Sequence, residues 1–291
     1  MIRTVARASV FAILALSFVV RAEAQVNLEL PHEPRKVAIH GPGAALYAPD
    51  GPGPHPAVVL SHTCATLGRH VTEWAGRMVD AGYVALVVDH LTPRGVKFNC
   101  PDKNTVSVTE YAQDATGGLK HLRALPFVDG RRVAHMGFSY GAMAGLRLAS
   151  ASFRQKHVGG ESFAAIVAFY PWCNKRTRMG GGDHQVNFYD DTDVPLLVLL
   201  GEADDDSPPD SCIEQAKKNI ARGLPVDWKL YPNATHGFDF SHLGAKPYRH
   251  HMGNRTVTFR YDPATVDLAL RDSRAFLARH LGAAARRSGS D

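Results

Sequence analysis

One serine in this chain stands between two glycines at a spacing that favours nucleophilic chemistry. Residues 137–141 read Gly-Phe-Ser-Tyr-Gly, an apolar run at 132–138 leads into them, and a helical pattern begins at Tyr140. Gly-x-Ser-x-Gly between a strand and a helix is typical of a nucleophile elbow, a turn so tight that side chains at the two glycines would collide with nearby backbone. The pattern therefore predicts that Ser139 Oγ is held out at the edge of a sheet, where it can attack a carbonyl carbon.

A serine hydroxyl is a poor nucleophile unless a histidine takes its proton and an acid holds that histidine in one tautomer. The elbow pattern also fits a simple turn of small residues, so these partners decide between the two interpretations. In chains with a catalytic elbow the acid comes next and the histidine last. An acidic loop at 201–209 follows the apolar run at 194–200, and His236 stands just past the run at 225–232. Three residues compete for the role of the acid: Asp204, Asp205 and Asp206.

Six short apolar runs alternate with helical patterns along the chain. The runs span residues 56–60, 83–90, 132–138, 163–171, 194–201 and 225–232. The helical patterns span residues 71–82, 108–125, 140–153, 209–223 and 262–281. Near-continuous apolar runs are typical of parallel strands that are covered on both faces. The alternation therefore predicts a single α/β domain over residues 25–291, with a mostly parallel sheet between two layers of helices.

Two stretches fall outside this alternation. Residues 33–48 are expected to add an antiparallel pair of strands at the front of the sheet. Residues 242–261 separate the last apolar run from the last helix, and we expect a lid or an additional hairpin there.

Residues 1–24 have the pattern of an export signal. Arg3 and Arg7 precede an apolar run at 9–20, and Ala22-Glu23-Ala24 is a small-x-small cleavage pattern. The run is short for a transmembrane helix, which needs about 20 apolar residues, so an uncleaved membrane anchor is the less favoured alternative. We therefore expect a mature chain that is periplasmic or secreted and is not held in a membrane.

The cysteine pattern favours disulfides over a metal site. The chain has four cysteines, Cys64, Cys100, Cys173 and Cys212. An even number in an oxidising compartment is typical of disulfides. There is no Cys-x-x-Cys and no His-Glu-x-x-His despite 15 histidines, so we expect neither a metal nor another cofactor. The net charge of +5 over 291 residues, without a stripe of basic side chains, does not indicate a nucleic-acid partner.

Three motifs together resemble the dienelactone hydrolase family of α/β-hydrolases, in a variant with serine as the nucleophile. They lie at 137–142, at 201–212 and at 231–239, and the resemblance runs from about residue 57 to residue 281. In the family's Gly-x-x-Asp-x-x-x-Pro pattern the first aspartate is the acid, which corresponds to Asp204. The resemblance therefore implies an α/β-hydrolase fold in which Ser139 is the nucleophile, Asp204 the orienting acid and His236 the base.

The chain also departs from the family pattern. Founding members use a cysteine nucleophile and carry a glutamate near the position of Thr63, where this chain has none. A glutamate there helps to manage the charge of a thiol, so its absence agrees with a serine enzyme. The common His-Gly-Cys-Gly-Gly sequence is His-Thr-Cys-Ala-Thr at 62–66, without the glycines. The resemblance implies that the oxyanion is bound by the backbone N–H groups of Tyr140 and Cys64.

The strand order of α/β-hydrolases further implies a disulfide pairing. All four cysteines follow predicted strands, on the side where parallel strands end. In that strand order the first two strands are neighbours, and so are the last two. Cysteines can bond only when their Cα atoms lie within about 7 Å of each other. The expected pairs are Cys64–Cys100 and Cys173–Cys212.

Taken together, the motifs predict a serine hydrolase that cleaves a small-molecule carboxylic ester or lactone through an acyl-enzyme. Two alternatives remain open at this point. One is a serine peptidase or acyltransferase on the same fold, because a fold supports many acyl substrates. The other is a binding protein that retains the fold without catalysis, against which the intact order of serine, acid and histidine argues.

Overall fold

A computed structural model describes residues 35–37, 43–100, 105–173, 188–244, 246–252 and 255–282. At its centre is an eight-stranded sheet with the order β1-β2-β4-β3-β5-β6-β7-β8. The strands are β1 (Arg35–Val37), β2 (Ala44–Tyr47), β3 (His55–Ser61), β4 (Val84–Val88), β5 (Val128–Phe138), β6 (Ala165–Phe169), β7 (Leu196–Gly201) and β8 (Val226–Tyr231). Strands β3 to β8 run parallel, whereas β1 and β2 add the expected antiparallel pair. The export signal expected over residues 1–24 lies outside the described residues.

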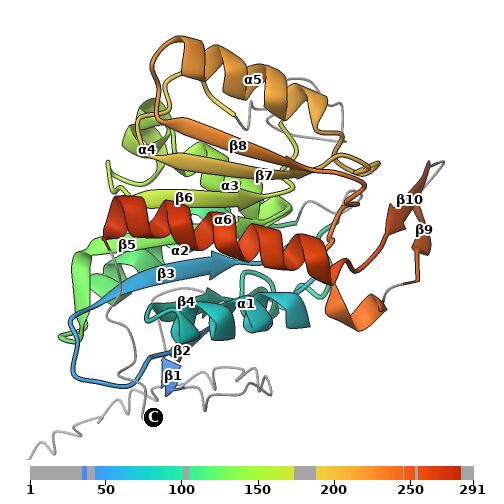
Figure 1. Cartoon of the computed structure of the whole chain (residues 1–291). Coiled ribbons are helices and arrows are strands. Elements are labelled where there is room, and N and C mark those ends of the chain that lie inside the picture. Colours follow the sequence, from blue (N-terminus) through green and yellow to red (C-terminus); the bar gives the residue numbers. More distant parts are fainter. Residues whose placement is uncertain are drawn as a thin grey trace, which may run out of the picture.

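Helices cover both faces of this sheet. They are α1 (Arg69–Asp80), α2 (Val108–Arg123), α3 (Tyr140–Leu148), α4 (Ala151–His157), α5 (Asp210–Ala221) and α6 (Pro263–Leu281), with short 3-10 helices η1 (Thr92–Arg94) and η2 (Ser241–Leu243). Helices α1 and α6 pack on one face, and α2, α3, α4 and α5 pack on the other (Figure 1). The fold is therefore the mostly parallel α/β arrangement that the alternating pattern predicts.

The strands are apolar on both faces because each face carries its own core. Along β3, Val59 belongs to the core on the side of α2 and α3, while Val58 and Leu60 belong to the core on the side of α1 and α6. Successive side chains of a strand point to opposite faces, so a doubly covered strand has no polar side. This burial explains why the sequence shows continuous apolar runs instead of alternation.

The helical pattern at 140–153 is two helices in the structure, not one. Helix α3 ends at Leu148, and Ser150 adopts an extended conformation in which its Oγ accepts the Phe153 N–H at 3.1 Å. Serine is a preferred N-cap because its side chain satisfies a free N–H of the first turn. A new helix, α4, therefore begins where the apolar periodicity alone suggests continuation.

The parallel strands all end at one edge of the sheet, and the predicted chemical residues follow three of them. Ser139 follows β5, the acidic loop at 201–209 follows β7, and His236 lies five residues beyond the end of β8. Residues 248–252 and 255–259 form an antiparallel hairpin, β9 (Tyr248–Met252) and β10 (Arg255–Phe259), beyond the same edge (Figure 1). The stretch expected to hold a lid or hairpin thus contains a hairpin.

Two disulfides lie at this edge as well. Cys64 bonds to Cys100 with a Cα–Cα distance of 4.8 Å, and Cys173 bonds to Cys212 with a distance of 5.0 Å. These are the pairs expected from the strand order, because β3 neighbours β4 and β6 neighbours β7. Cys64, Cys100 and Cys173 lie in the segments that follow β3, β4 and β6, and Cys212 lies in the first turn of α5, the helix that follows β7.

Removing the second bridge should destabilise the fold without removing its core. The double variant Cys173→Ser, Cys212→Ser is expected to lose up to about 3–4 kcal/mol of unfolding free energy, because the unfolded chain regains loop entropy. Urea unfolding followed by circular dichroism measures this loss. Peptide mapping without reductant should show Cys64–Cys100 and Cys173–Cys212, and a peptide that joins Cys64 to Cys212 would contradict the strand order.

Candidate active site

The turn at Ser139 is strained in the way a nucleophile elbow requires. Ser139 has φ 51° and ψ −107°, a region that residues with side chains rarely occupy. Its N–H donates to the Phe169 carbonyl at 2.9 Å, and helix α3 begins at the next residue. The strand β5 on one side and the helix on the other hold the strained residue in place. The hydroxyl is thereby presented at the carboxyl edge of the sheet.

The two glycines of the motif are required by two different close contacts. A Cβ on Gly137 would lie 2.2 Å from the Gly141 carbonyl oxygen, so the first glycine makes room for the second. A Cβ on Gly141 would lie 2.2 Å from the Ser61 carbonyl oxygen at the end of β3. Side chains at either position would therefore displace backbone, which cannot yield as a flexible side chain does.

His236 links the serine to a carboxylate. Its Nε2 lies 3.0 Å from Ser139 Oγ, and its Nδ1 lies 2.8 Å from Asp204 Oδ2. The imidazole is almost completely buried, so both contacts are shielded from bulk water. A carboxylate on Nδ1 holds the proton there and leaves Nε2 free to accept the serine proton. Ser139 and His236, expected from chain order, and Asp204, implied by the family resemblance, thus meet in one hydrogen-bonded chain.

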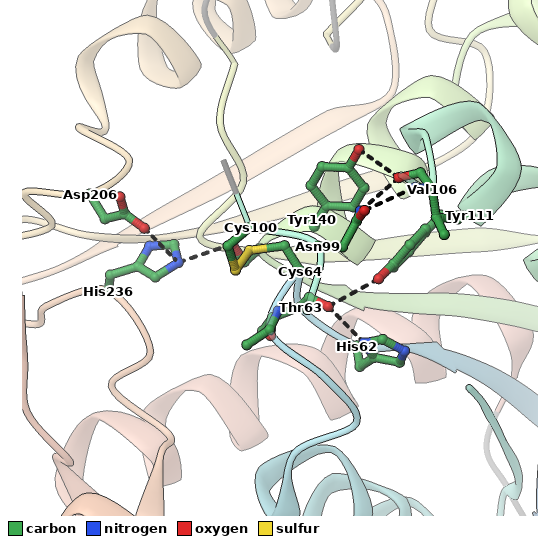
Figure 2. Close-up of a disulfide and its surroundings, with 12 residues drawn as sticks. His62, Thr63, Cys64, Asn99, Cys100, Val106, Tyr111, Tyr140, Asp206 and His236 are labelled. Carbon is green, nitrogen blue, oxygen red and sulfur yellow. Dashed lines mark hydrogen bonds and ion pairs between the residues drawn. A yellow bond between two sulfur atoms is a disulfide. The ribbon is translucent and has the colours of Figure 1, made fainter. Parts of the chain in front are cut away.

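The three neighbouring aspartates have three different positions. Asp204 Oδ1 accepts the N–H groups of Asp206 and Ser207 at 3.0 and 2.7 Å, which fixes its carboxylate toward His236. Asp205 accepts the Thr258 N–H at 3.0 Å and so anchors the β9–β10 hairpin. Asp206 Oδ2 lies 3.7 Å from His236 Nε2, on the side of the ring that faces the serine (Figure 2). The structure therefore places Asp204, and not its two neighbours, on Nδ1.

The charges around His236 set its proton affinity. Burial alone would lower the pKa of His236, but the carboxylates of Asp204, Asp206 and Asp239 outweigh it and raise the pKa to about 9. Asp239 is itself buried and accepts Trp74 Nε1–H at 2.8 Å and the Tyr170 hydroxyl at 2.7 Å. Burial raises the pKa of Asp239 to about 6.

Asp239 and Tyr170 are parts of the site that the sequence reasoning did not single out. The Tyr170 ring packs edge-on against the His236 ring at 4.7 Å between centroids, and Tyr170 has a positive φ of 39°. The only sequence signal was an aspartate three residues after the histidine, in Thr-His-Gly-Phe-Asp. A buried hydroxyl and a buried carboxylate are normally hydrogen-bonded, but only the packing shows that Tyr170 and Asp239 are each other's partners.

The two proposed oxyanion donors lie on segments that contact each other. The Gly141 N–H donates to the His62 carbonyl at 3.1 Å, which brings the loop after β3 against the first turn of α3. Tyr140 is the first residue of α3, so its N–H has no acceptor within the helix. Cys64 is two residues beyond His62, and its own carbonyl accepts the Asn99 N–H at 2.9 Å.

The hairpin forms one wall beside the histidine. His236 makes an isolated parallel bridge with Phe259 of β10, and the two rings lie 6.0 Å apart. Phe259 also stacks on Phe240 at 5.9 Å.

Within the described ranges, no three side chains of His, Cys, Asp or Glu lie close enough to hold a metal ion.

Comparison with known proteins identifies the family. The sequence profile of the dienelactone hydrolase family matches residues 43–281, which is most of the chain. The chain belongs to the dienelactone hydrolase family. Its fold is the α/β-hydrolase fold, as the motif resemblance implies.

One curated esterase is similar to part of this chain, and several solved structures are similar to most of it. Esterase FrsA of Escherichia fergusonii is 31% identical over 141 residues, which are 44% of this chain and 31% of that protein. Thermogutta terrifontis esterase 2, solved in a form phosphorylated by paraoxon, superposes with a TM-score of 0.64 at 15% identity and covers 88% of this chain and 97% of its own. The dienelactone hydrolase-like promiscuous phosphotriesterase P91 from metagenomic libraries superposes at 0.63 with 22% identity, over 85% of this chain and 98% of its own. The chain thus matches less than a third of the curated esterase, and the solved structures share its fold.

The close contact at Gly141 gives a first prediction for this family member. Gly141→Ala should lose most activity, because the new Cβ would push the helix start away from the end of β3. Ester hydrolysis and thermal unfolding of the variant measure the effect on the site and on the fold. Gly159→Ala is a control away from the site: a Cβ there meets nothing within 4 Å, but its φ of +68° strains an alanine, so this variant should lose stability and keep hydrolysis per folded molecule. Unchanged hydrolysis by Gly141→Ala would contradict the contact.

The acidic loop gives a second prediction. His236 accepts a proton only when neutral, so kcat/KM should rise with pH through the raised pKa of His236. Asp206→Asn removes a carboxylate 3.7 Å from Nε2 and should therefore lower the pKa of His236. The rise of kcat/KM with pH should then occur at lower pH, while kcat at high pH stays unchanged. Asp204→Asn should instead reduce turnover by about 10³–10⁴-fold, because the histidine takes the wrong tautomer. A larger turnover loss in Asp206→Asn than in Asp204→Asn would overturn the assignment of the acid.

Proposed function

We propose that this protein is a serine hydrolase that cleaves a carboxylic ester or lactone of a small molecule. The observation that carries the proposal is the hydrogen-bonded chain from Ser139 Oγ through His236 to Asp204, at the carboxyl edge of a parallel sheet. Membership of the dienelactone hydrolase family supports hydrolysis as the reaction class. Ser139 is the proposed nucleophile, His236 the base and Asp204 the orienting acid.

The proposed reaction has two halves. Ser139 Oγ attacks the carbonyl carbon while His236 Nε2 takes its proton, and the carbonyl oxygen becomes an oxyanion. His236 then gives the proton to the leaving alcohol, which leaves an acyl-enzyme on Ser139. Water attacks the acyl carbon with His236 again as the base, and Ser139 is released. In a lactone the leaving alcohol stays attached to the acyl group, so the product is a hydroxy acid.

Stabilisation of the oxyanion is assigned to the backbone N–H groups of Tyr140 and Cys64. The first lies at the free N-terminal end of α3, where helix N–H groups favour negative charge. The second lies on the loop that the Gly141–His62 hydrogen bond holds beside that helix end. Backbone donors suit this role because they are fixed before the charge develops.

Export to the periplasm or the cell exterior is part of the proposal. The pattern of residues 1–24 is that of a signal peptide, and the two disulfides are stable in an oxidising compartment. In the part of the chain that the structure describes, no helix is both long and apolar enough to cross a membrane.

A covalent probe tests the nucleophile. A fluorophosphonate should label the wild-type protein at Ser139 alone, and Ser139→Ala should remain folded but lose nearly all hydrolysis of aryl esters. Labelling is located by mass spectrometry of peptides, and hydrolysis is measured on matched panels of esters and lactones. Labelling at another serine, or full activity in Ser139→Ala, would refute the assignment.

Ser61 offers a matched control within the same chain. Its buried Oγ lies 2.9 Å from Nε2 of the buried His135, so it too is a serine paired with a histidine. No hydrogen-bond partner is present on His135 Nδ1 in the described structure, so this pair lacks an orienting acid. Ser61→Ala should therefore keep hydrolysis per folded molecule, although it leaves His135 Nε2 without its partner and costs about 1–3 kcal/mol of stability.

Acyl transfer to an added alcohol or amine in preference to water would favour an acyltransferase or peptidase instead.

A further inference from the structure

The carbonyl of Thr63 accepts two side-chain hydrogen bonds in the interior of the protein. His62 Nδ1 lies 2.6 Å from this oxygen, and the Tyr111 hydroxyl of helix α2 lies 3.2 Å from it. Both donors are completely buried. Thr63 and Cys64 share one peptide unit, so whatever holds the Thr63 carbonyl also holds the Cys64 N–H. A polar cluster outside the serine–histidine–aspartate chain therefore acts on a proposed oxyanion donor.

The tautomer of His62 follows from its second contact. The backbone N–H of His90 donates to His62 Nε2 at 3.0 Å, so Nε2 must be the unprotonated nitrogen. The proton is then on Nδ1, which donates it to the Thr63 carbonyl. Burial and the neighbouring His90 lower the pKa of His62 to about 3, so the ring stays neutral at ordinary pH. His62 is thus a permanent donor to this carbonyl.

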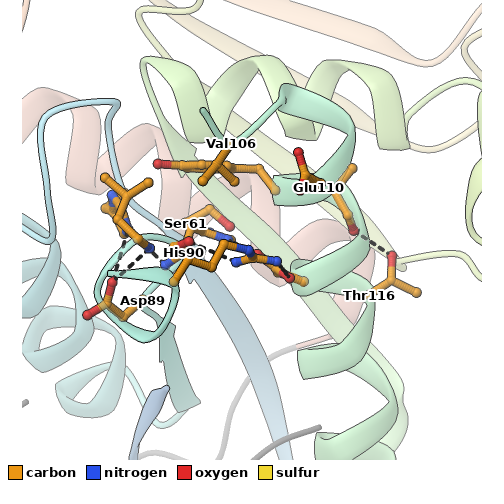
Figure 3. A network of polar contacts seen from close by, with 12 residues as sticks. Ser61, Asp89, His90, Val106, Glu110 and Thr116 are labelled. Carbon is orange, nitrogen blue, oxygen red and sulfur yellow. Dashed lines mark hydrogen bonds and ion pairs between the residues drawn. The ribbon is translucent and has the colours of Figure 1, made fainter. Parts of the chain in front are cut away.

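Tyr111 is held by its own supports. The His90 ring stacks on the Tyr111 ring at 3.8 Å with an interplanar angle of 18°. His90 Nδ1 contacts Asp114 Oδ2 at 2.9 Å, and Arg94 binds both oxygens of Asp114 at 2.8 Å. Figure 3 shows part of this network, with His90 and Asp89 at the end of β4 beside helix α2. The position of the tyrosine hydroxyl is therefore set by packing and by an ion pair, not by a mobile side chain.

Peptide geometry carries this constraint to the other side of the loop. The Thr63–Cys64 bond is trans, and in a trans peptide the N–H points opposite to the C=O. Figure 2 shows His62 and Tyr111 on one side of Thr63, with the Cys64–Cys100 disulfide and His236 on the other. The carbonyl that follows, that of Cys64, is held by the Asn99 N–H at 2.9 Å. Both peptide units around Cys64 are thus fixed by hydrogen bonds.

We propose that Tyr111, together with His62, is a positioning residue that aims the Cys64 N–H at the oxyanion by holding the Thr63 carbonyl. The inference rests on the proposed function, since it concerns the oxyanion site of that reaction. The buried cluster on α2 and after β4 thus fixes a loop that has side chains where the common His-Gly-Cys-Gly-Gly sequence has glycines.

The test uses a ligand that forms the tetrahedral oxyanion without leaving-group chemistry. With phenyl trifluoromethyl ketone, Ser139 Oγ bonds to the carbonyl carbon, its proton goes to His236, and the carbonyl oxygen becomes the oxyanion. Tyr111→Phe keeps the ring that stacks on His90 and removes only the hydroxyl. It should raise the inhibition constant of the ketone about tenfold and lower kcat for ester hydrolysis by about the same factor. KM should stay within about twofold, since the bond matters only once the oxyanion forms.

Tyr231→Phe is the matched control. Its hydroxyl also makes one hydrogen bond from a buried ring, to Asp272 Oδ2 of α6 at 2.9 Å. Strands β5, β6 and β7 separate β8 from β3, the strand that leads into the oxyanion loop. This variant should leave the inhibition constant and kcat unchanged. Titration of active sites with fluorophosphonate counts the folded, reactive molecules of each variant, so partial misfolding cannot imitate the effect.

The outcomes separate the two proposals. If the wild type binds the ketone and Tyr111→Phe binds it equally tightly, the positioning role is wrong while the serine hydrolase stands. If Tyr111→Phe shifts the pH at which kcat/KM rises, the tyrosine acts on His236 and the inference also fails. If the variant raises KM alone, the tyrosine acts on substrate binding and the inference fails as well. If the wild type is labelled by neither ketone nor fluorophosphonate at Ser139, the proposed function fails and the inference with it.

Discussion

The close backbone contact between the start of helix α3 and the end of strand β3 is the constraint on which the site depends. Gly141 lies so near the Ser61 carbonyl that no side chain fits, and its N–H is bonded to the His62 carbonyl. This contact joins the strained serine to the loop that carries Cys64. Strained backbone persists only where the surroundings over-determine it, and here a strand, a helix and a neighbouring loop all do so. The proposed nucleophile and the proposed oxyanion donors are thereby parts of one rigid unit.

The histidine side of the site is governed by a balance between burial and negative charge. A buried imidazole with no neighbours would stay neutral, but three carboxylates face this one and raise its pKa. Two of them come from the acidic loop after β7, and the third, Asp239, follows the histidine in sequence. Asp239 accepts hydrogen bonds from Trp74 and Tyr170, which belong to the core between the sheet and helices α1 and α6. This core therefore holds the carboxylate of Asp239 near His236. The packing of that core thus contributes to the proton affinity of the proposed base.

The polar groups that hold the oxyanion loop come from the opposite face of the sheet. His62, His90, Tyr111 and Asp114 are buried between the end of β4 and helix α2, and the more exposed Arg94 binds Asp114 from the surface. Buried polar groups are costly unless they are paired, and most hydrogen-bonding groups of this cluster find a partner. The site therefore receives support from both faces of the sheet, the histidine from one side and the oxyanion loop from the other. A disulfide to Cys100 completes the fixation of Cys64.

The sequence by itself determined the α/β architecture, because doubly buried strands leave continuous apolar runs and glycines mark the elbow. Chain order with the family resemblance also pointed to Ser139, His236 and Asp204, which the structure brings within hydrogen-bond distance. Only the tertiary structure showed that Asp206 lies near Nε2, that Asp205 anchors the hairpin, and that helix α3 stops at Leu148. Asp239, Tyr170 and Tyr111 were equally invisible, since each owes its place to a partner distant in sequence. Local patterns report strain and burial along the chain, whereas the pairing of buried polar groups is decided only when separate elements pack together.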